Sequence, residues 1–323
     1  MNNTDLNNAR ASKQDEFYTH YNIINEEIKH YINYNKNIFK DKTIFLPCDD
    51  PEKSNFTKFF IDNFKKFGLK KLISTSYAKN KKQGKLFTFC KERCTVEYNH
   101  ITFGHLEGDG DFRSDEIKKI RDESDFIITN PPFSLFRAFV SWIFNAKKKF
   151  LILGNLNAVI YKEIFPLIRD NKLWLGKSIH SGQREFAVPK NYPLNATESR
   201  IDEDGNKFVK VKGVRWFTNI NYGKRNPSLQ LMTMEENILH NKKLKGEQYL
   251  QFDNYDAINV PSIDTIPSDY KGVMGVPISF LDKYCPEQFE IVSFRKGEDG
   301  KDLFFTKDGK KIIPFFRILI RHR

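Results

Sequence analysis

The sequence has 323 residues, 39% of them hydrophobic, and carries 53 Lys and Arg against 41 Asp and Glu. Its net charge of +12 favours a polyanionic partner, although a coding bias towards Lys, Asn and Ile explains the charge equally well. The longest apolar run is short, the N-terminus is polar and the four cysteines form no CxxC pair. The composition therefore excludes a membrane-spanning protein and predicts a soluble, cytoplasmic protein that needs no metal.

The first half of the sequence alternates expected strands with expected helices. Residues 1–13 are polar and are expected to form a flexible arm. Strands are expected at 42–48, 70–77, 126–129, 149–154 and from 172, and helices at 23–32, 56–67, 114–121, 135–146 and 159–171. A β-hairpin is expected at 85–103. This alternation predicts an α/β protein with a mostly parallel, doubly wound sheet.

A candidate catalytic loop follows the strand expected at 126–129. Proline donates no N–H, so Asn130, Pro131, Pro132 and Phe133 leave the strand at its carboxyl end, where open α/β sheets bind ligands. The Asn130 side-chain oxygen and the Pro131 carbonyl would accept both hydrogens of an exocyclic amine on an aromatic base. Phe133 would stack on that base. The motif indicates methylation of a planar nitrogen, and an ordinary Asn-Pro turn is the alternative.

Two other segments are candidates for binding a nucleotide-like cofactor. Asp49 and Asp50 follow the first strand, where either carboxylate would accept hydrogen bonds from such a cofactor, although Asp50 would equally well start a helix. In the loop at 106–112, Asp111 would accept from an adenine amino group and Phe112 would pack on its ring. A plain acidic turn is an equally good interpretation of that loop.

The C-terminal half is expected to be rich in short β segments. From about residue 181, turn clusters separate alternating segments in which Lys and Arg are interleaved with aromatic residues. Such a region would follow a phosphate backbone and present side chains to base edges. A solvated β-rich face is the alternative. The candidate DNA-binding residues selected here are Arg215, Lys224 and Arg225.

Six stretches spread over most of the chain carry a family resemblance. They are Asp15–Thr19, Pro47–Phe56, Gly108–Phe112, Thr129–Phe136, Arg215–Asn219 and Gly272–Ile278. Together they resemble the EcoRI-type adenine-N6 DNA methyltransferases. Asn-Pro-Pro-Phe alone is shared with several amine-methylating enzymes, whereas its combination with Cys-Asp-Asp-Pro and Arg-Trp-Phe-Thr-Asn is much more specific.

The resemblance implies a Rossmann-like methyltransferase fold, S-adenosylmethionine as the donor, and a flipped-out adenine in double-stranded DNA as the acceptor. By motif, it implies that Asn130 and Pro131 bind the adenine amine and that Phe133 stacks on the base. The residues that it implies for cofactor binding are Phe17, Tyr18, Thr19, Cys48, Asp49, Asp50, Asp111 and Phe112. Two departures from the broader pattern are the lack of Gly-x-Gly after the first strand and of an acidic residue after the second.

The resemblance also implies how the chain is divided. Residues 14–180 would form the donor-binding catalytic domain and residues 181–323 the target-recognition region. Protection of host DNA from a separately encoded restriction endonuclease is implied, and a monomer is expected by default. Two rival functions are methyl transfer to RNA or a protein amide, and DNA binding without catalysis. The basic C-terminal region argues against the first, and the intact Asn130–Phe133 loop argues against the second.

Overall fold

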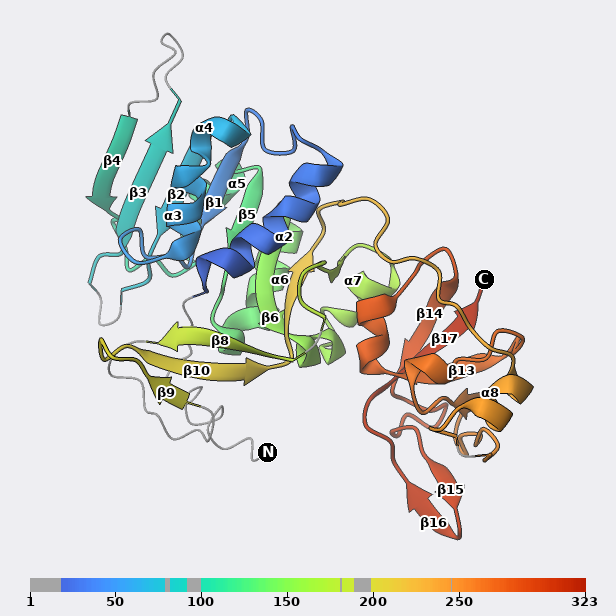
Figure 1. Ribbon diagram of the computed structural model, residues 1–323. Helices are drawn as coiled ribbons and strands as arrows, with labels where there is room; N and C mark the ends of the chain where they lie inside the picture. The colour runs from blue at the N-terminus through green and yellow to red at the C-terminus, as the bar shows by residue number, and fades with distance from the viewer. Residues whose placement is uncertain (1–18, 79–81, 92–99, 181, 189–198, 245) are drawn as a thin grey trace. The chain divides into compact units, whose positions relative to one another are not determined.

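The computed structural model describes residues 19–78, 82–91, 100–180, 182–188, 199–244 and 246–323. The chain divides into two compact units. The first comprises Met1–Ile164 and Leu173–Gly223, and the second comprises Phe165–Lys172 and Lys224–Arg323. The first unit holds an eight-stranded and a three-stranded sheet, and the second holds a four-stranded sheet and a two-stranded hairpin (Figure 1).

The eight-stranded sheet has the order β4-β3-β2-β1-β5-β6-β11-β7. Its strands are β1 (Thr43–Leu46), β2 (Lys71–Thr75), β3 (Lys85–Cys90), β4 (His100–His105), β5 (Phe126–Thr129), β6 (Lys149–Asn155), β7 (Trp174–Leu175) and β11 (Val214–Thr218). Strands β2, β1, β5 and β6 are parallel, and β3 and β4 form an antiparallel pair at one edge. The predicted mostly parallel α/β sheet and the hairpin strands are therefore confirmed. The connection between β3 and β4, residues 92–99, lies outside the described residues.

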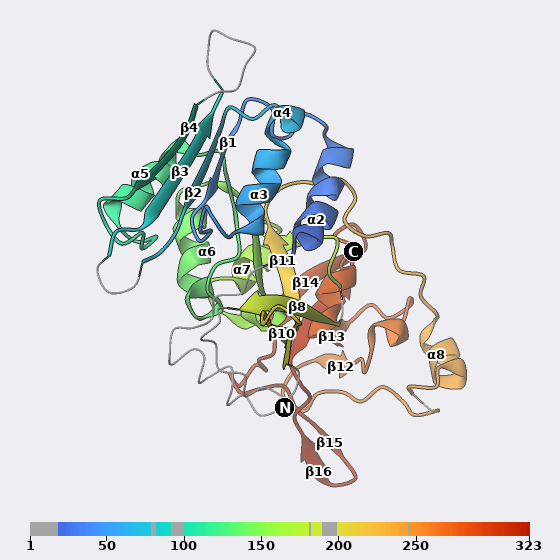
Figure 2. The same cartoon turned by 60° about the vertical axis from the view of Figure 1, so that its left-hand side comes forward.

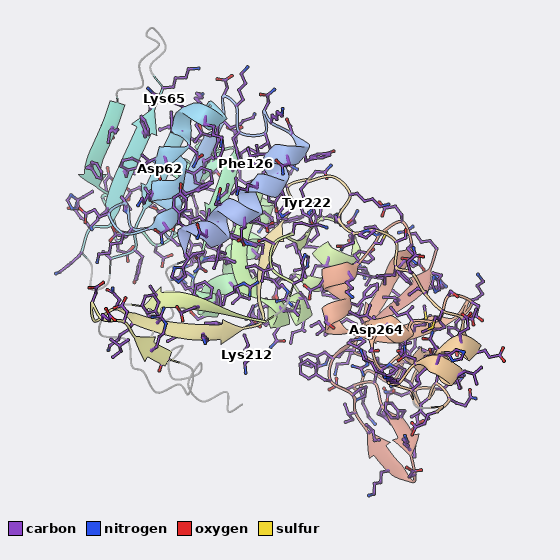
Figure 3. All side chains as sticks on the ribbon, in the orientation of Figure 1. Asp62, Lys65, Phe126, Lys212, Tyr222 and Asp264 are labelled. Atoms are coloured by element: carbon purple, nitrogen blue, oxygen red, sulfur yellow. The ribbon has the colours of Figure 1, made fainter. Side chains whose placement is uncertain are left out.

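Helices cover both faces of this sheet. Figure 2 shows α2 and α3 on one face and α5 and α6 on the other. The helices of the first unit are α2 (Tyr21–Tyr34), α3 (Asn55–Asp62), α4 (Phe64–Phe67), α5 (Asp115–Glu123) and α6 (Phe136–Asn145), with the 3₁₀ turns η1 (Phe133–Leu135) and η2 (Leu156–Ile160). Because both faces are covered, every residue of β1 and of β5 is buried, as their apolar sequences predict. Phe126 of β5, which is labelled in Figure 3, packs on Phe39, and their ring centroids are 5.2 Å apart.

Local signals fix the segment from α3 to α4. The Ser54 hydroxyl caps α3 by accepting from the Phe56 N–H at 3.0 Å. Gly68 ends α4 with a φ of +64°, in the left-handed region that favours glycine. The single helix expected at 56–67 is interrupted at Asn63, whose side chain donates to the Phe59 carbonyl at 2.9 Å.

Strand β11 enters the central sheet from the part of the chain that was expected to recognise the target. It lies antiparallel between β6 and β7, with Trp216 opposite Leu153. All five of its residues are buried, so the sheet would expose a large apolar gap without it.

The helix expected over 159–171 is confirmed only in part. The segment instead forms η2 and, in the second unit, the short helix α7 (Phe165–Arg169). Pro166 explains the late start, because its ring has no N–H to donate and clashes with the carbonyl four residues earlier.

A buried carboxylate ties α2 to the segment after β7. Glu27 is 0% exposed and accepts from the Tyr31 hydroxyl at 2.9 Å and from the Ser178 N–H at 2.7 Å. Burial, with the nearby Glu27 charge, raises the pKa of Tyr31 well above its usual value. A Cβ at Gly176 would lie 2.3 Å from Glu27 Oε1, so only glycine fits there.

The remaining sheets are antiparallel or mixed. In the first unit, β10 (Lys207–Lys212) pairs with both β8 (Gln183–Val188) and β9 (Ser199–Ile201). The second unit contains α8 (Met234–His240), η3 (Ile263–Thr265), η4 (Ile278–Lys283), β12 (Ala257–Asn259), β13 (Val273–Pro277), β14 (Phe289–Phe294), β15 (Phe305–Lys307), β16 (Lys310–Ile312) and β17 (Arg317–His322). Its four-stranded sheet has the order β12-β13-β17-β14 and packs around Phe252, Leu303 and Leu319.

Candidate active site

The candidate catalytic and cofactor segments meet at one edge of the central sheet. Strands β1, β2 and β5 run parallel, so their carboxyl ends lie together. The loop at 108–112 joins this edge, because the Ala78 N–H donates to the Asp109 carbonyl at 2.7 Å. Gly110 permits the close approach: its φ is +84°, and a Cβ there would lie 2.3 Å from the Ser76 carbonyl oxygen.

Asp49 joins three elements at this edge. Its side chain is buried, with Oδ1 accepting from the Ser54 hydroxyl at 2.5 Å and Oδ2 accepting from the Thr129 hydroxyl at 2.6 Å. The aspartate thereby links the end of β1 to the start of α3 and to the last residue of β5. Burial raises the pKa of Asp49 to about 6, while the two hydroxyl donors act in the opposite direction.

Two further hydroxyl groups, those of Ser74 and Thr57, support the backbone of Asp49. The Ser74 hydroxyl donates to the Asp49 carbonyl at 2.6 Å and lies 2.8 Å from the Thr57 hydroxyl. Sequence reasoning did not select these serine and threonine residues. Their only signal is small hydroxyl side chains at the carboxyl ends of otherwise apolar strands, as at Ser74 and Thr129.

Asn130 is held by Thr19, which lies two residues before α2. Its Nδ2 donates to the Thr19 hydroxyl at 3.2 Å, and the Thr19 carbonyl accepts from Asn55 Nδ2 at 2.9 Å. Thr19 is 3% exposed, so these bonds lie away from bulk water. Two predicted residues, Thr19 and Asn130, are thus brought into direct contact from positions 111 residues apart. Phe17 and Tyr18 lie outside the described residues.

The rest of the Asn130–Phe133 loop turns directly into a helix. Pro131 is buried and Pro132 half-buried, and the Pro132 carbonyl accepts from the Leu135 N–H at 3.0 Å. Phe133 begins η1 and is only 6% exposed, packed within the hydrophobic core. Its ring was expected to present a face to a base, whereas here it is covered by the protein; the stacking role stays a prediction.

Asp50 differs from its neighbour Asp49 in its surroundings. Its carboxylate is partly exposed and pairs with Lys85 of β3 at 3.2 Å. Lys85 also pairs with Glu52 at the surface. Cys48 is half-buried beside them. Of the two predicted acidic cofactor ligands, Asp50 is therefore the more accessible.

Asp111 and Phe112 are adjacent but differently engaged. Asp111 Oδ1 accepts from the Arg113 N–H at 2.8 Å and from Arg113 Nε at 2.9 Å, which closes the turn. Phe112 is 6% exposed and packs edge-on against Phe139 of α6, with centroids 5.1 Å apart. This geometry contains the acidic turn that the sequence offered as one interpretation, at the same sheet edge as Asn130.

The three predicted DNA-binding residues differ in their burial and belong to two different units. Arg215 lies in β11 and is 5% exposed, and its guanidinium donates to the Val214 and His180 carbonyls at 2.8 and 2.5 Å. That burial favours a structural role. Lys224 and Arg225 begin the second unit, where Lys224 is exposed and Arg225 Nη1 donates to Asn171 Oδ1 at 2.5 Å.

Two further observations concern the described parts of the chain. Within them, no three His, Cys, Asp or Glu side chains are gathered in a way that would hold a metal ion. Among the helices that the structure describes, none has both the length and the apolar character needed to cross a membrane.

Comparisons with known proteins add a family. The profile of the family "Adenine-specific methyltransferase EcoRI" matches residues 5–323. The chain is 43% identical over 330 residues to the Type II methyltransferase M.EcoRI of Escherichia coli, covering 98% of this chain and 96% of that protein. It is 40% identical over 289 residues to M.MgeORF184P of Mycoplasma genitalium, covering 89% and 85%. Over 289 residues it is also 36% identical to M.MpnI of Mycoplasma pneumoniae, covering 89% and 84%.

Proposed function

The chain belongs to the adenine-specific methyltransferase EcoRI family, and from this premise we propose that it transfers the methyl group of S-adenosylmethionine to N6 of an adenine flipped out of duplex DNA. The family makes the protein an adenine-specific DNA methyltransferase. The donor, the extrusion of the base and the roles of individual residues are our proposal. The observation that carries it is the contact of Asn130 with Thr19 at the carboxyl edge of the sheet.

The residues at this edge fit S-adenosylmethionine. Partly exposed carboxylates at Asp50 and Asp111 stand at the ends of neighbouring segments, where they would accept from the ammonium, ribose or adenine groups of the donor. Asp49 contributes indirectly, because its two oxygens already accept from Ser54 and Thr129. When bound, the donor supplies an electrophilic methyl group.

The protein's own contribution is to orient the acceptor amine. Because Asn130 Nδ2 donates to the Thr19 hydroxyl, Oδ1 is the amide atom directed away from Thr19. We assign Oδ1 and the Pro131 carbonyl to the two hydrogens of the adenine N6 amine, which favours a pyramidal, nucleophilic nitrogen. Acceptors fixed in advance stabilise the charge that develops on that nitrogen without having to reorganise.

Two features, one stiff and one buried, keep those acceptors in place. Pro131 and Pro132 restrict the backbone of the loop. Thr129, the residue before Asn130, is anchored to Asp49 at 2.6 Å. Phe133 would stack on the extruded base, which requires its covered ring to become accessible when DNA binds. The transfer needs no nucleophilic side chain and no covalent enzyme intermediate.

We further propose that the protein is the modification enzyme of a restriction–modification pair. The support is that the relatives are named Type II methyltransferases. Its methylation would protect host sites from a separately encoded endonuclease, and the enzyme would act as a monomer. Arg225 and the exposed Lys224 are proposed as phosphate contacts in the second unit.

The test is mass spectrometry of the nucleosides from unmethylated genomic DNA incubated with S-adenosylmethionine and the purified full-length protein. We expect N6-methyladenine with the wild type and an approximately 1000-fold lower rate with Asn130→Ala, since one lost transition-state acceptor costs about 10²–10³. Donor and DNA affinities measured by calorimetry should stay within about 3-fold. Methylation of RNA or peptide in place of DNA contradicts the proposal, as does an Asn130→Ala enzyme of normal rate.

A further inference from the structure

An apolar patch is exposed in the second unit, where the chain passes from β16 to β17. Ile313 and Phe315 are 58% and 66% exposed, and Ile312 at the end of β16 is 38% exposed. Single exposed hydrophobic residues are ordinary, but a group of them within four residues marks an interaction surface.

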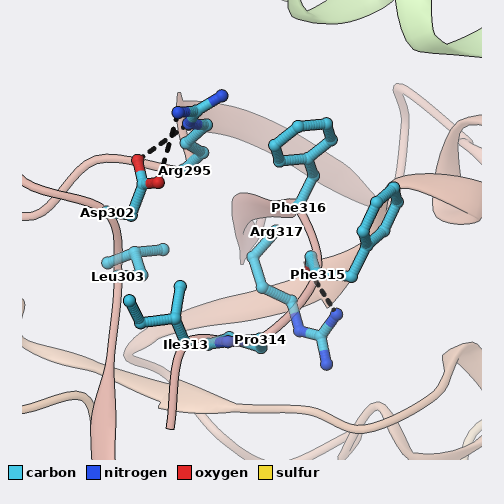
Figure 4. A pocket seen from close by; sticks show the side chains of 8 residues that line it. All are labelled: Arg295, Asp302, Leu303, Ile313, Pro314, Phe315, Phe316 and Arg317. Atoms are coloured by element: carbon cyan, nitrogen blue, oxygen red, sulfur yellow. Dashed lines mark hydrogen bonds and ion pairs between the residues drawn. The ribbon is translucent and has the colours of Figure 1, made fainter. Parts of the chain in front are cut away.

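The exposed ring of Phe315 is held in place from behind. It packs on Phe316 with centroids 4.7 Å apart, and the Arg295 guanidinium lies 4.9 Å from the Phe316 centroid (Figure 4). Arg295 is itself fixed by Asp302, whose Oδ1 accepts from Nε at 2.8 Å. The Phe315 carbonyl accepts from Arg317 Nη1 at 2.8 Å. A ring fixed before binding loses little conformational entropy when a partner arrives.

A small cavity adjoins this ring. It has a volume of about 180 Å³ and is lined in part by Arg317, Leu303 and Pro314 (Figure 4). Burial lowers the pKa of Arg317 to about 10, so the guanidinium remains charged at neutral pH. The surface therefore combines a flat apolar face with a partly desolvated cation, which suits a partner with flat rings and acceptor atoms.

The sequence on either side of the patch is rich in cations, although Lys307 and Arg321 pair with Glu247 and Glu290. Residues 305–323 contain six Lys or Arg and a single acidic residue, Asp308. The β15–β16 hairpin extends from the second unit and exposes Lys310 and Lys311 close in sequence to the patch (Figure 1). Asp308 and Gly309 form its tip, with φ of 51° and 71°. The exposed lysines are suited to contact phosphates, and the apolar side chains next to them are suited to contact bases.

We propose that Ile313 and Phe315 form an apolar wedge that inserts at a base step of duplex DNA, with Lys310 and Lys311 on the flanking phosphates. The inference rests on the proposed function, in which duplex DNA supplies the acceptor. Inserting an apolar side chain partly unstacks and bends the duplex. Because base extrusion must overcome stacking, a wedge would lower the cost of presenting the adenine.

The experiment compares Phe315→Ala with the matched control Leu239→Ala in the full-length protein. Leu239 lies on α8 of the same unit and is 67% exposed, so both changes remove an equally exposed apolar side chain. Affinity is measured by fluorescence anisotropy on a duplex that holds one methylation site mapped with the wild type. 2-Aminopurine placed at each base step in turn reports unstacking.

Phe315→Ala is expected to weaken binding about 10-fold, within the range for losing one aromatic contact to a base, and to abolish the fluorescence rise at one step outside the target adenine. Leu239→Ala should change neither. Ile313→Ser provides a second variant, and donor affinity with thermal unfolding verifies that each variant is folded.

Three outcomes overturn the wedge. One is unchanged affinity and unchanged 2-aminopurine signals in both Phe315→Ala and Ile313→Ser. Another is equal loss in Leu239→Ala. The third is self-association of the wild type without DNA that Phe315→Ala removes in sedimentation, which would assign the patch to a second copy of the chain. A wild type that transfers no methyl group to DNA refutes the proposed function instead, so the two failures are distinguishable.

Discussion

Charged side chains are usually exposed and large apolar ones buried. The carboxyl edge of the central sheet and the patch around Phe315 depart from this rule in opposite directions. At the sheet edge, the charged Asp49 is buried, whereas in the second unit the apolar Phe315 is exposed. Each is held by its neighbours: Asp49 by the hydroxyls of Ser54 and Thr129, and Phe315 by the tilted ring of Phe316. Hydrogen bonds in the interior fix the atoms of the proposed active site, whereas ring packing holds the proposed recognition surface.

The two kinds of support should respond differently to change. A buried hydrogen-bond network fails when one partner is removed, because the other polar groups lose their bonds away from water. An exposed ring can be removed with little effect on folding, because it contributes little buried area. Substitutions at the sheet edge should therefore alter stability or rate, and those at the patch should alter binding.

The largest effect expected on stability is that of Asp49→Ala. It leaves the Ser54 and Thr129 hydroxyls without their acceptor in the interior, which costs about 1–3 kcal/mol each. We expect the free energy of unfolding to fall by about 3 kcal/mol in urea titrations. Asp50→Ala is the control: its partly exposed pair with Lys85 contributes less than about 1 kcal/mol. Equal losses in both variants would contradict the distinction between the two carboxylates.

A smaller effect is expected from pH. The pKa of Asp49 is raised from 3.8 to about 6 in the folded protein, so the fold favours the protonated form. The contribution of this group to stability is therefore complete below about pH 4 and is lost as pH rises through about 6. Linkage predicts a loss of about 2 kcal/mol between pH 4.5 and pH 7.

Asp49→Asn isolates that contribution. The unfolding free energies of wild type and variant are compared at pH 4.5 and at pH 7. Because asparagine does not titrate, the variant should gain about 2 kcal/mol relative to the wild type between the two pH values. A difference that stays constant with pH would show that Asp49 has an ordinary pKa in the fold.

The smallest effect expected is on rate alone. Thr19→Val removes the hydroxyl that accepts from Asn130 Nδ2, so the amide loses this contact. We expect the rate constant of methyl transfer in single-turnover assays to fall about 10-fold, the cost of one hydrogen bond of about 1.4 kcal/mol, with DNA affinity unchanged. Thr19→Ser keeps the hydroxyl and should restore the rate. If serine is as slow as valine, the methyl group of Thr19 matters instead of its hydroxyl.

The sequence correctly predicted which residues lie at the carboxyl edge of the sheet. It did not predict which of their side chains are buried and which are exposed. The apolar strand, the two prolines and the following helix predicted the position of Asn130, and Ser54 predicted the start of α3. Asp49 and Asp50 looked equivalent because both follow the first strand. Only the packing of β5 and α3 reveals that one carboxylate is enclosed and the other remains reachable.

Long-range pairing limited the remaining sequence-based predictions. Arg215 was selected as a DNA contact because it is a cation among aromatic residues, yet β11 pairs with β6 and buries it. Thr19 was selected through the resemblance, but its bond to Asn130 joins residues 111 positions apart. Phe315 was not selected at all. Neither the exposure of its side chain nor the packing of its ring on Phe316 leaves a local pattern in the sequence.

The insertion of β11 between β6 and β7 also constrains how the protein is made. A nascent chain that has emerged only as far as β7 has no partner to join that strand to β6, because the joining strand is about 40 residues further on. Domains generally fold as units, with N-terminal segments first, during synthesis. The central sheet instead becomes complete only after Thr218 has been synthesised. A chain on a ribosome that has stalled before that residue therefore has an incomplete sheet.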